Sequence, residues 1–426
     1  MALIFSSTAL AQESIEQLNG LYNDGSLIRR IDDGEWLVYS HAESCNFSKV
    51  IDGITSFETI HLPDEILSVT DFEICNDYVY MCGYADDGYT YMGYFDLTAF
   101  PYPAFDYILL DGIDSVIKLD VVPSSPEFSN TLCQVVMTGE KSDGLGVIID
   151  AVPSGTGWVV YHITPYHDEH TYPFYYDVAI VDDYVVFTYF DCTEKEYTPE
   201  KCTNGILYFS MPATPTTPLI NSTLDAMSLV YIPTVPFLAK KCEGNAFVTA
   251  TRHPKGNIYV SGFDGLVSHG TAVLHTEQSR LRDIAYNKGG YSTEVLVINQ
   301  GANLYCSEIY TVLHPMATWP GSTWGHLYYG NILNSLIYQE QCGNRFIVTG
   351  TNGDPYQQLF LFRYNSTLFI RECNELFEME TTPYIKNPAP VLFNMEYSPL
   401  YGDIITTETT KETTAIENIC GEVPGE

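Results

Sequence analysis

The densest group of chemically active side chains in the sequence is His167-Asp168-Glu169-His170. Imidazoles and carboxylates are donors that divalent transition metals accept, and an imidazole also titrates near neutral pH. The spacing differs from the His-Glu-x-x-His helix motif, and no helical periodicity surrounds it. The segment therefore predicts either a solvated loop or a metal-binding or pH-sensitive contact.

Two acidic turns offer the oxygen ligands that Ca²⁺ prefers. They are Asp86-Asp87-Gly88 and Asn352-Gly353-Asp354, and neither follows an EF-hand pattern. Asp, Asn and Gly are also ordinary turn residues, because they tolerate the backbone angles that tight turns require. We therefore predict no cofactor, with Ca²⁺ or another divalent metal as the alternative.

Aromatic residues near turns are the other candidate contacts. Tyr89 lies beside Asp86, and Trp319 and Trp324 flank a Pro/Gly segment that we expect to lie outside any strand. Such rings present flat faces to a sugar or a peptide. The sequence contains no Gly-x-Ser-x-Gly nucleophile motif and no Gly-rich phosphate loop. It therefore favours a binding protein over an enzyme, although a triad drawn from distant segments stays open.

The elements that must position these residues are short β-strands. Residues 71–97 predict strands at Asp71–Cys75, Tyr78–Tyr84 and Tyr91–Leu97, with a hairpin turn at Asn76-Asp77. Aromatic and β-branched residues are frequent, and long helical periodicity is nearly absent, so the class is all-β. Similar copies recur about every 50 residues, at 28–52, 116–151, 176–212, 237–265, 280–312 and 335–365.

This repeat resembles the blade of a β-propeller of the divergent, secreted type, without the motif of a specific subfamily. The resemblance implies a single propeller over residues 12–426 with seven four-stranded blades, eight being the alternative. Residues 375–426 would close the ring or form a partial extra blade. In propellers one set of loops gathers on one face, the default binding site. That face would collect His41, Asp86, Asp87, Tyr89, His167, Asp168, Glu169, His170, His253, Trp319, Trp324 and Asp354.

The charge of the chain limits its partners. The sequence has 54 Asp and Glu against 19 Lys and Arg, a formal net charge of -35. Such a field repels nucleic-acid phosphates and anionic membranes, and it suits cations, neutral glycans or basic protein patches. No apolar run approaches the ~20 residues that span a bilayer. We expect a protein or glycan partner, no nucleic acid and no membrane-spanning segment.

Cysteine usage and the first residues indicate an exported protein. The chain has 11 Cys and no Cys-x-x-Cys pair, which favours an oxidising compartment. Residues 1–11 end in Ala-Leu-Ala and resemble the end of a truncated signal peptide. We predict a secreted, periplasmic or cell-surface protein. The expected local disulfide joins Cys192 and Cys202, and a Cys45–Cys420 pair would suit closure of the ring.

Three segments satisfy the N-glycosylation rule. They are Asn46-Phe47-Ser48, Asn221-Ser222-Thr223 and Asn365-Ser366-Thr367. Because the chain is rich in Asn, Ser and Thr, chance occurrence explains them equally well.

Three functions remain open. The first is a secreted or surface-exposed propeller that recognises a protein or glycan partner through its loop-rich face. The second is a propeller enzyme, a hydrolase or lyase acting on extracellular glycans with carboxyl or imidazole groups. The third is a structural subunit of a surface assembly, which would expose a large apolar patch.

Overall fold

The computed structural model describes residues between 14 and 421. The segments outside the described residues are 1–13, 23–26, 33–34, 42–43, 52–55, 123–131, 155–156, 167–172, 193–201, 213, 215–216, 230–236, 241–244, 253–256, 275–279, 287–293, 301–305, 314–322, 330, 340–344, 353–357, 366–374, 380, 385–388 and 422–426. The proposed signal peptide, 1–11, is therefore among them.

The predicted all-β class is confirmed. Among the described residues the chain forms strands and short 3-10 turns, namely η1 (Asp86–Gly88), η2 (Leu97–Ala99) and η5 (Leu219–Asn221). In the same part of the chain, no helix is long and apolar enough to span a membrane. The three strands predicted within residues 71–97 are observed with similar bounds, as the end of β6, as β7 and as β8.

Strands that follow one another in the chain pair antiparallel in the same sheet. The first four groups are β2 (Leu27–Asp32), β3 (Glu35–His41), β4 (Cys45–Ile51) and β5 (Ser56–His61); β6 (Ile66–Cys75), β7 (Tyr78–Ala85), β8 (Thr90–Asp96) and β9 (Ala104–Leu109); β10 (Ile113–Val122), β11 (Gln134–Lys141), β12 (Gly146–Ser154) and β13 (Gly157–Tyr166); and β14 (Phe174–Val181), β15 (Tyr184–Cys192), β16 (Cys202–Ser210) and β17 (Leu224–Ser228).

The remaining groups follow the same plan, except that the last one takes its outer strand from the start of the chain. They are β18 (Phe237–Lys240), β19 (Ala246–Arg252), β20 (Ile258–Asp264) and β21 (Val267–Leu274); β22 (Arg280–Tyr286), β23 (Glu294–Gln300), β24 (Cys306–Leu313) and β25 (Thr323–Tyr329); and β26 (Asn331–Gln339), β27 (Arg345–Asn352) and β28 (Gln358–Asn365), completed by β1 (Ser14–Tyr22). β1 pairs with β28.

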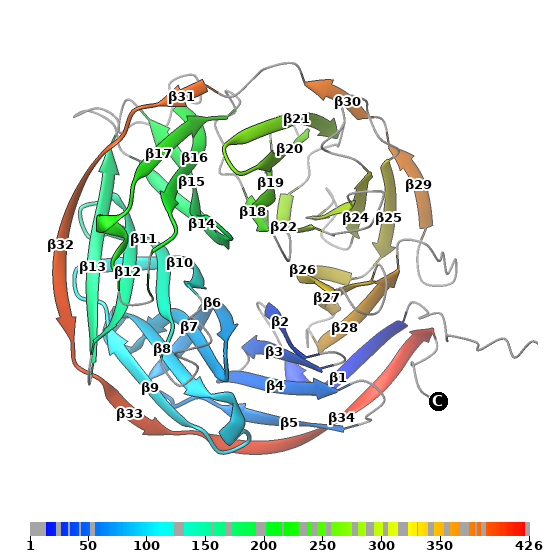
Figure 1. Ribbon diagram of the computed structural model, residues 1–426. Helices are drawn as coiled ribbons and strands as arrows, with labels where there is room; N and C mark the ends of the chain where they lie inside the picture. The colour runs from blue at the N-terminus through cyan, green and yellow to red at the C-terminus, as the bar shows by residue number, and fades with distance from the viewer. Residues whose placement is uncertain are drawn as a thin grey trace, which may run out of the picture.

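The groups stand side by side around a ring (Figure 1). The first strand of each group lies nearest the centre, and we call β2, β6, β10, β14, β18, β22 and β26 the inner strands. Neighbouring inner strands contact one another in an unbroken cycle that returns from β26 to β2. The ring therefore closes through side-by-side packing of separate sheets, and no single sheet closes on itself.

The end of the chain runs around the outside of this ring, as the orange and red strands of Figure 1 show. We call residues 375–421 the strap. Its strands are β29 (Glu375–Met379), β30 (Thr381–Tyr384), β31 (Ala389–Val391), β32 (Asn394–Gly402), β33 (Ile405–Glu408) and β34 (Thr410–Gly421). They pair antiparallel with β25, β21, β17, β13, β9 and β5 in that order.

The strap therefore visits the sheets in reverse chain order and adds an outermost strand to each. β34 continues from β5 to β1, which joins the first and last groups into one nine-stranded sheet beside five five-stranded sheets. Each strap strand covers the outer edge of the sheet that it joins and, in the five-stranded sheets, becomes the new outer edge.

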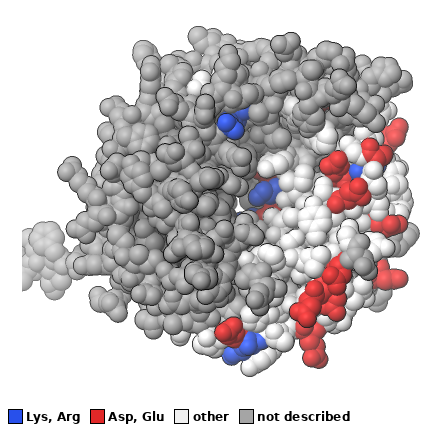
Figure 2. All heavy atoms as spheres, turned by 180° about the vertical axis from the view of Figure 1, so that it is seen from behind, with Lys and Arg blue, Asp and Glu red and all other residues white. Residues whose placement is uncertain are grey.

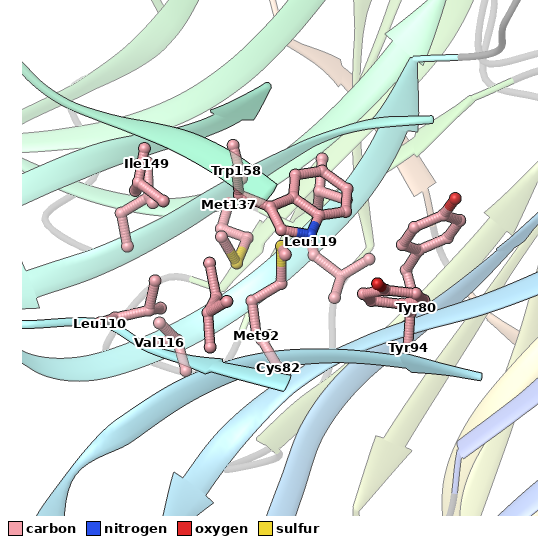
Figure 3. Packing of buried hydrophobic residues seen from close by; sticks show 14 of the residues in the cluster. Tyr80, Cys82, Met92, Tyr94, Leu110, Val116, Leu119, Met137, Ile149 and Trp158 are labelled. Atoms are coloured by element: carbon pink, nitrogen blue, oxygen red, sulfur yellow. The ribbon is translucent and has the colours of Figure 1, made fainter. Parts of the chain in front are cut away.

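Hydrophobic cores lie between neighbouring sheets. Alternate side chains of β7 enter two cores: Val79 and Met81 pack with residues of β3–β5, whereas Tyr80 and Cys82 pack with residues of β11–β13. Figure 3 shows the second of these cores, with Met137 and Trp158 facing Met92 and Tyr94. Successive side chains of a strand point to opposite faces. Because each face of these strands packs into a core, both faces are apolar. Each fully buried side chain of this size contributes ~1.5–3 kcal/mol.

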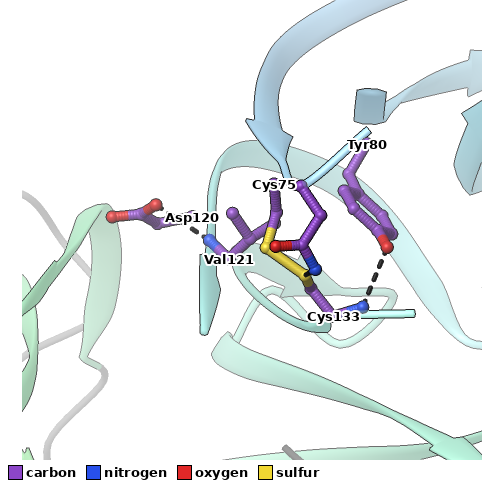
Figure 4. Close-up of a disulfide and its surroundings, with 6 residues drawn as sticks. Cys75, Tyr80, Asp120, Val121 and Cys133 are labelled. Carbon is purple, nitrogen blue, oxygen red and sulfur yellow. Dashed lines mark hydrogen bonds between the residues drawn. A yellow bond between two sulfur atoms is a disulfide. The ribbon is translucent and has the colours of Figure 1, made fainter. Parts of the chain in front are cut away.

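One disulfide, between Cys75 and Cys133, links two neighbouring sheets (Figure 4). Cys75 ends β6 and Cys133 precedes β11, and the Cys133 N–H donates to Tyr80 Oη at 2.8 Å. The bridge spans 58 residues of sequence. Closing a loop of that length restricts the unfolded chain and typically stabilises a protein by ~2–4 kcal/mol.

The predicted cysteine pairs have different outcomes. Cys45 is a buried free thiol, so the Cys45–Cys420 pair is wrong. Its Sγ donates to the Ile66 carbonyl at 3.4 Å, and burial raises the pKa of this thiol to about 11. Cys192 and Cys202 lie opposite each other in the β15–β16 register. Their side chains lie outside the described residues, so that disulfide stays a prediction.

Candidate functional site

The predicted site residues divide into described and undescribed positions. His167, Asp168, Glu169, His170, His253, Trp319 and Asp354 lie outside the described residues. His41 is half-buried at the end of β3, and Trp324 lies in β25 opposite Thr311. The expectation that Trp324 lies outside any strand is therefore wrong, because Thr323–Tyr329 pairs with both β24 and the strap.

Asp86, Asp87 and Tyr89 come together in the tight turn between β7 and β8. The Ala85 N–H donates to the Tyr89 carbonyl at 2.8 Å, and Gly88 supplies a φ of +80° that other residues rarely adopt. The Asp86 N–H donates to the Glu65 carbonyl at 2.8 Å. These bonds hold the turn against the β5–β6 connection, with Asp86 and Tyr89 exposed.

Two further exposed apolar side chains lie next to this turn, and sequence reasoning missed both. Leu67 follows Ile66, which pairs with Ala85 at the start of the turn. Leu109 pairs with Tyr91, and the next residue, Leu110, donates its N–H to the Thr90 carbonyl at 2.9 Å. The exposed fractions are 47% for Leu67, 50% for Tyr89 and 37% for Leu109. We call Leu67, Tyr89 and Leu109 the apolar patch.

Exposed carboxylates lie in or beside the connections at the same end of the sheets as the apolar patch. They are Asp64, Glu65, Asp86, Asp111, Asp114 and Asp143. Two of them act on a nearby tyrosine: burial raises the pKa of Tyr107, and the charges of Glu65 and Asp86 raise it further. The neighbouring cation Lys141 is half-buried and donates to Thr164 Oγ1 at 2.8 Å. This end of the sheets therefore carries exposed apolar side chains together with exposed carboxylates.

A group of basic side chains lies elsewhere, on inner strands. Figure 2 shows Lys or Arg side chains at a hollow near the centre of the ring, with most Asp and Glu of that face farther out. Arg29 of β2 pairs with Glu73 and with Asp71, its Nη2 lying 2.7 Å from Asp71 Oδ1. Lys118 of β10 lies 3.9 Å from the same oxygen. This network joins three neighbouring inner strands.

Buried aspartates on inner strands bind the backbone of the next sheet. Asp71 Oδ2 accepts from the Leu119 N–H at 3.1 Å. Asp120 accepts from Val121 at 2.8 Å and from Ile180 at 2.6 Å; Figure 4 shows the first of these bonds. Asp177 accepts from the Val178 N–H at 2.9 Å and the Leu238 N–H at 2.8 Å. These carboxylates hold adjacent sheets together, a role that sequence reasoning missed.

Two other buried ionisable groups lie in the sheet of β10–β13. Burial raises the pKa of Asp150 to about 7, although Gln134 Nε2 and the Leu219 N–H donate to its oxygens at 2.6 and 2.7 Å. Burial lowers the pKa of His162 to about 4, and the nearby Lys141 charge lowers it further. Asp150 is therefore neutral at pH values at which an exposed Asp is ionised, and His162 is neutral at pH values at which an exposed His is protonated.

No group of three or more His, Cys, Asp or Glu side chains is arranged to hold a metal ion in the described part of the chain. The Ca²⁺ alternative at Asp86-Asp87-Gly88 stays a prediction. The described residues place exposed apolar side chains and exposed carboxylates at one end of the sheets, and they use other, buried carboxylates to hold the sheets together.

Comparison with known proteins adds no functional assignment. No protein-family model matches this sequence, and no curated protein is significantly similar to it.

Proposed function

We propose that the chain is a single β-propeller of seven blades that acts as a secreted or surface-exposed binding protein. Seven groups of consecutive antiparallel strands, a cycle of contacts among the inner strands and the ring in Figure 1 support the propeller. The disulfide between Cys75 and Cys133 supports export, since such bonds persist in oxidising compartments.

The binding surface in this proposal is the apolar patch with its surrounding carboxylates. The observation that carries the proposal is that Leu67, Tyr89 and Leu109 expose 37–50% of their area at one end of one sheet. Leu67 lies at the start of β6, Tyr89 in the β7–β8 connection and Leu109 at the end of β9. The Ile66–Ala85 and Tyr91–Leu109 pairings place all three at the same end of the sheet. Apolar side chains at the centre of a polar surround are typical of protein interfaces.

The negative charge near the patch favours a positively charged partner. Six exposed carboxylates lie at the same end of the sheets, in a chain of net charge -35. A partner with Lys or Arg beside an apolar side chain would meet complementary charge, and long-range attraction would speed its association. Because exposed charges are screened by salt, this binding weakens as ionic strength rises. We therefore propose a protein partner with a basic, partly apolar surface.

The buried carboxylates are less suited to catalysis than to structure. A general acid or base needs an oxygen that can reach the substrate proton. Asp120 and Asp177 have both oxygens bound to backbone N–H groups, and Asp71 is held by Arg29 and Leu119. These contacts favour the binding protein over the glycan-cleaving enzyme.

The proposal is tested by biolayer interferometry of the full chain against a synthetic peptide of alternating Lys and Leu, with a Ser/Gly peptide as reference. We expect binding that Leu67→Ser/Tyr89→Ser weakens by about tenfold or more, as loss of two interface contacts typically does. The matched control is Leu266→Ser/Val267→Ser, which removes two side chains of similar exposure, 38% and 59%, at the β20–β21 turn.

That turn joins the third and fourth strands of its group, so it lies at the opposite end of the sheets from the β7–β8 turn. The control pair should therefore bind as the unaltered chain does. Equal losses in the two pairs, or no preference for the Lys/Leu peptide over the reference, would contradict the proposal.

A further inference from the structure

Two of the three glycosylation sequences lie in strongly different surroundings. Asn46 belongs to β4 and is only 4% exposed. Its Oδ1 accepts from Ser44 Oγ at 3.0 Å and contacts His61 Nδ1. Asn221 ends the η5 turn and is exposed, as is Thr223 two residues later. The sequence rule is met equally at both positions, but only one of them has room for an oligosaccharide in the folded chain.

The η5 turn is fixed firmly enough to hold Asn221 at the surface. Its first residue, Leu219, is fully buried, and the Leu219 N–H donates to Asp150 Oδ2 at 2.7 Å. The Ser222 N–H donates to the Leu219 carbonyl at 2.8 Å, and the Thr223 N–H donates to Ser210 Oγ at 3.0 Å. These contacts anchor both sides of the turn while its tip, Asn221, stays in solvent.

We propose that Asn221 carries an N-linked glycan in the folded protein and that Asn46 does not. In this modification Asn221 Nδ2 forms a bond to the anomeric carbon of a lipid-pyrophosphate-linked oligosaccharide. The carbon–oxygen bond to the pyrophosphate breaks, the lipid pyrophosphate leaves, and one amide proton is lost. The compartment that supplies this donor in secretory cells is also oxidising, as the Cys75–Cys133 bridge requires.

A glycan at Asn46 is incompatible with this fold. Glycan transfer precedes completion of folding, so accessibility in the folded state decides which glycosylated chains fold. With an oligosaccharide on Nδ2, Asn46 could not keep its buried position between Ser44 and His61. Chains modified there would fail to reach the native state and would be lost from the folded population.

The position of Asn221 also fits the proposed binding surface. η5 connects β16 to β17, the third and fourth strands of their group, whereas η1 and Tyr89 connect the second and third strands of theirs. In antiparallel sheets these two connections lie at opposite ends. A glycan at Asn221 therefore leaves the apolar patch uncovered.

The test is site mapping on the full chain exported from cultured eukaryotic cells behind a secretion signal. Folded, monomeric protein is collected by size exclusion and treated with peptide-N-glycosidase in ¹⁸O water, so that each occupied Asn becomes ¹⁸O-labelled Asp. We expect label at residue 221 and none at residue 46 in the mass spectra of the corresponding peptides.

Matched variants separate the two positions without relying on mapping alone. Asn221→Gln should remove one glycan from the intact mass, and Asn46→Gln should remove none. Circular dichroism checks that each variant is folded. An unlabelled residue 221 in folded secreted protein, or a labelled residue 46 in that same fraction, would overturn the proposal.

Discussion

The inner strands and the strap hold the same sheets together by different means. Between inner strands the contacts are buried: Asp71, Asp120 and Asp177 each accept a backbone N–H from the neighbouring sheet. The strap is bound chiefly by backbone pairing along outer strands, and most described side chains of 403–413 are exposed. Buried side-chain hydrogen bonds therefore hold the sheets together at the centre of the ring, whereas backbone pairing holds the strap at its rim.

The strap itself is not uniform. Val391, Phe393 and Met395 pack against the core between the third and fourth sheets, and the Phe393 ring lies 5.0 Å from that of Tyr189. In contrast, β33 and the start of β34 carry Thr and Glu, held by surface contacts such as Lys411 Nζ to Glu58 at 2.7 Å. The strap is therefore anchored at 391–395 and only edge-paired over 405–413.

If buried side chains hold the centre of the ring, the largest loss of stability should follow removal of a buried carboxylate there. Asp120→Ala leaves the Val121 and Ile180 N–H groups without this acceptor, so we expect it to lower the free energy of unfolding by about 3–5 kcal/mol. The strap control is Thr406→Ala, which removes a bond to Asp106 at the surface and should cost at most about 0.5 kcal/mol. Urea denaturation measures both, and similar losses would contradict the contrast.

A second prediction uses the pH dependence of the buried Asp150. Its folded pKa of about 7 lies above the unfolded value, so its contribution to stability is complete below about pH 4 and is lost as pH rises through 7. His162 acts oppositely, because its lowered pKa gives stability above about pH 6.5 that is lost as pH falls through 4. The two effects partly cancel in the unaltered chain.

Asp150→Asn isolates one of them. Relative to the unaltered chain, this variant should gain about 2–4 kcal/mol between pH 4.5 and pH 8, because only the unaltered chain must ionise a buried acid. His162 is present in both proteins and drops out of the difference. Thermal unfolding across this range measures it, with the exposed Asp225→Asn as control. A pH-independent difference would show that Asp150 is not held neutral.

The smallest expected loss of stability distinguishes the anchored part of the strap, 391–395, from the edge-paired part, 405–413. Phe393→Ala removes a half-buried ring from the third core and should cost about 1–2 kcal/mol. Ile405→Ala removes a side chain that is 37% exposed and should cost at most about 0.5 kcal/mol. Hydrogen exchange should likewise show faster opening over 405–413 than over 391–395. Equal exchange rates would mean that side-chain anchoring does not matter at the rim.

Sequence reasoning succeeded where the signal is local. The bounds of β7 and β8 were predictable because apolar residues alternate and because Asn76-Asp77 forms a turn, where Asn76 adopts a φ of 54°. The exposed turn at Asp86 and Tyr89 was predictable for the same reason. These features depend on a few consecutive residues.

It failed where distant segments decide the outcome. The strap strands were recognisable only as strand-like runs, since backbone pairing at an edge leaves little side-chain pattern to identify the partner. The Cys75–Cys133 bridge depends on which sheets are neighbours. Leu67 and Leu109 lie in apolar runs that predict buried strands, so nothing in the sequence indicates that both side chains are exposed at the same end of the sheet as Tyr89.

The central claim, recognition of a basic partner at the apolar patch, is tested most directly by hydrogen exchange on the full chain with and without the saturating Lys/Leu peptide. The account predicts that bound peptide slows exchange at 64–67, 86–90 and 109–114, and leaves 264–267 and 405–413 unchanged. Protection confined to the strap, or spread evenly over both ends of the sheets, would contradict it.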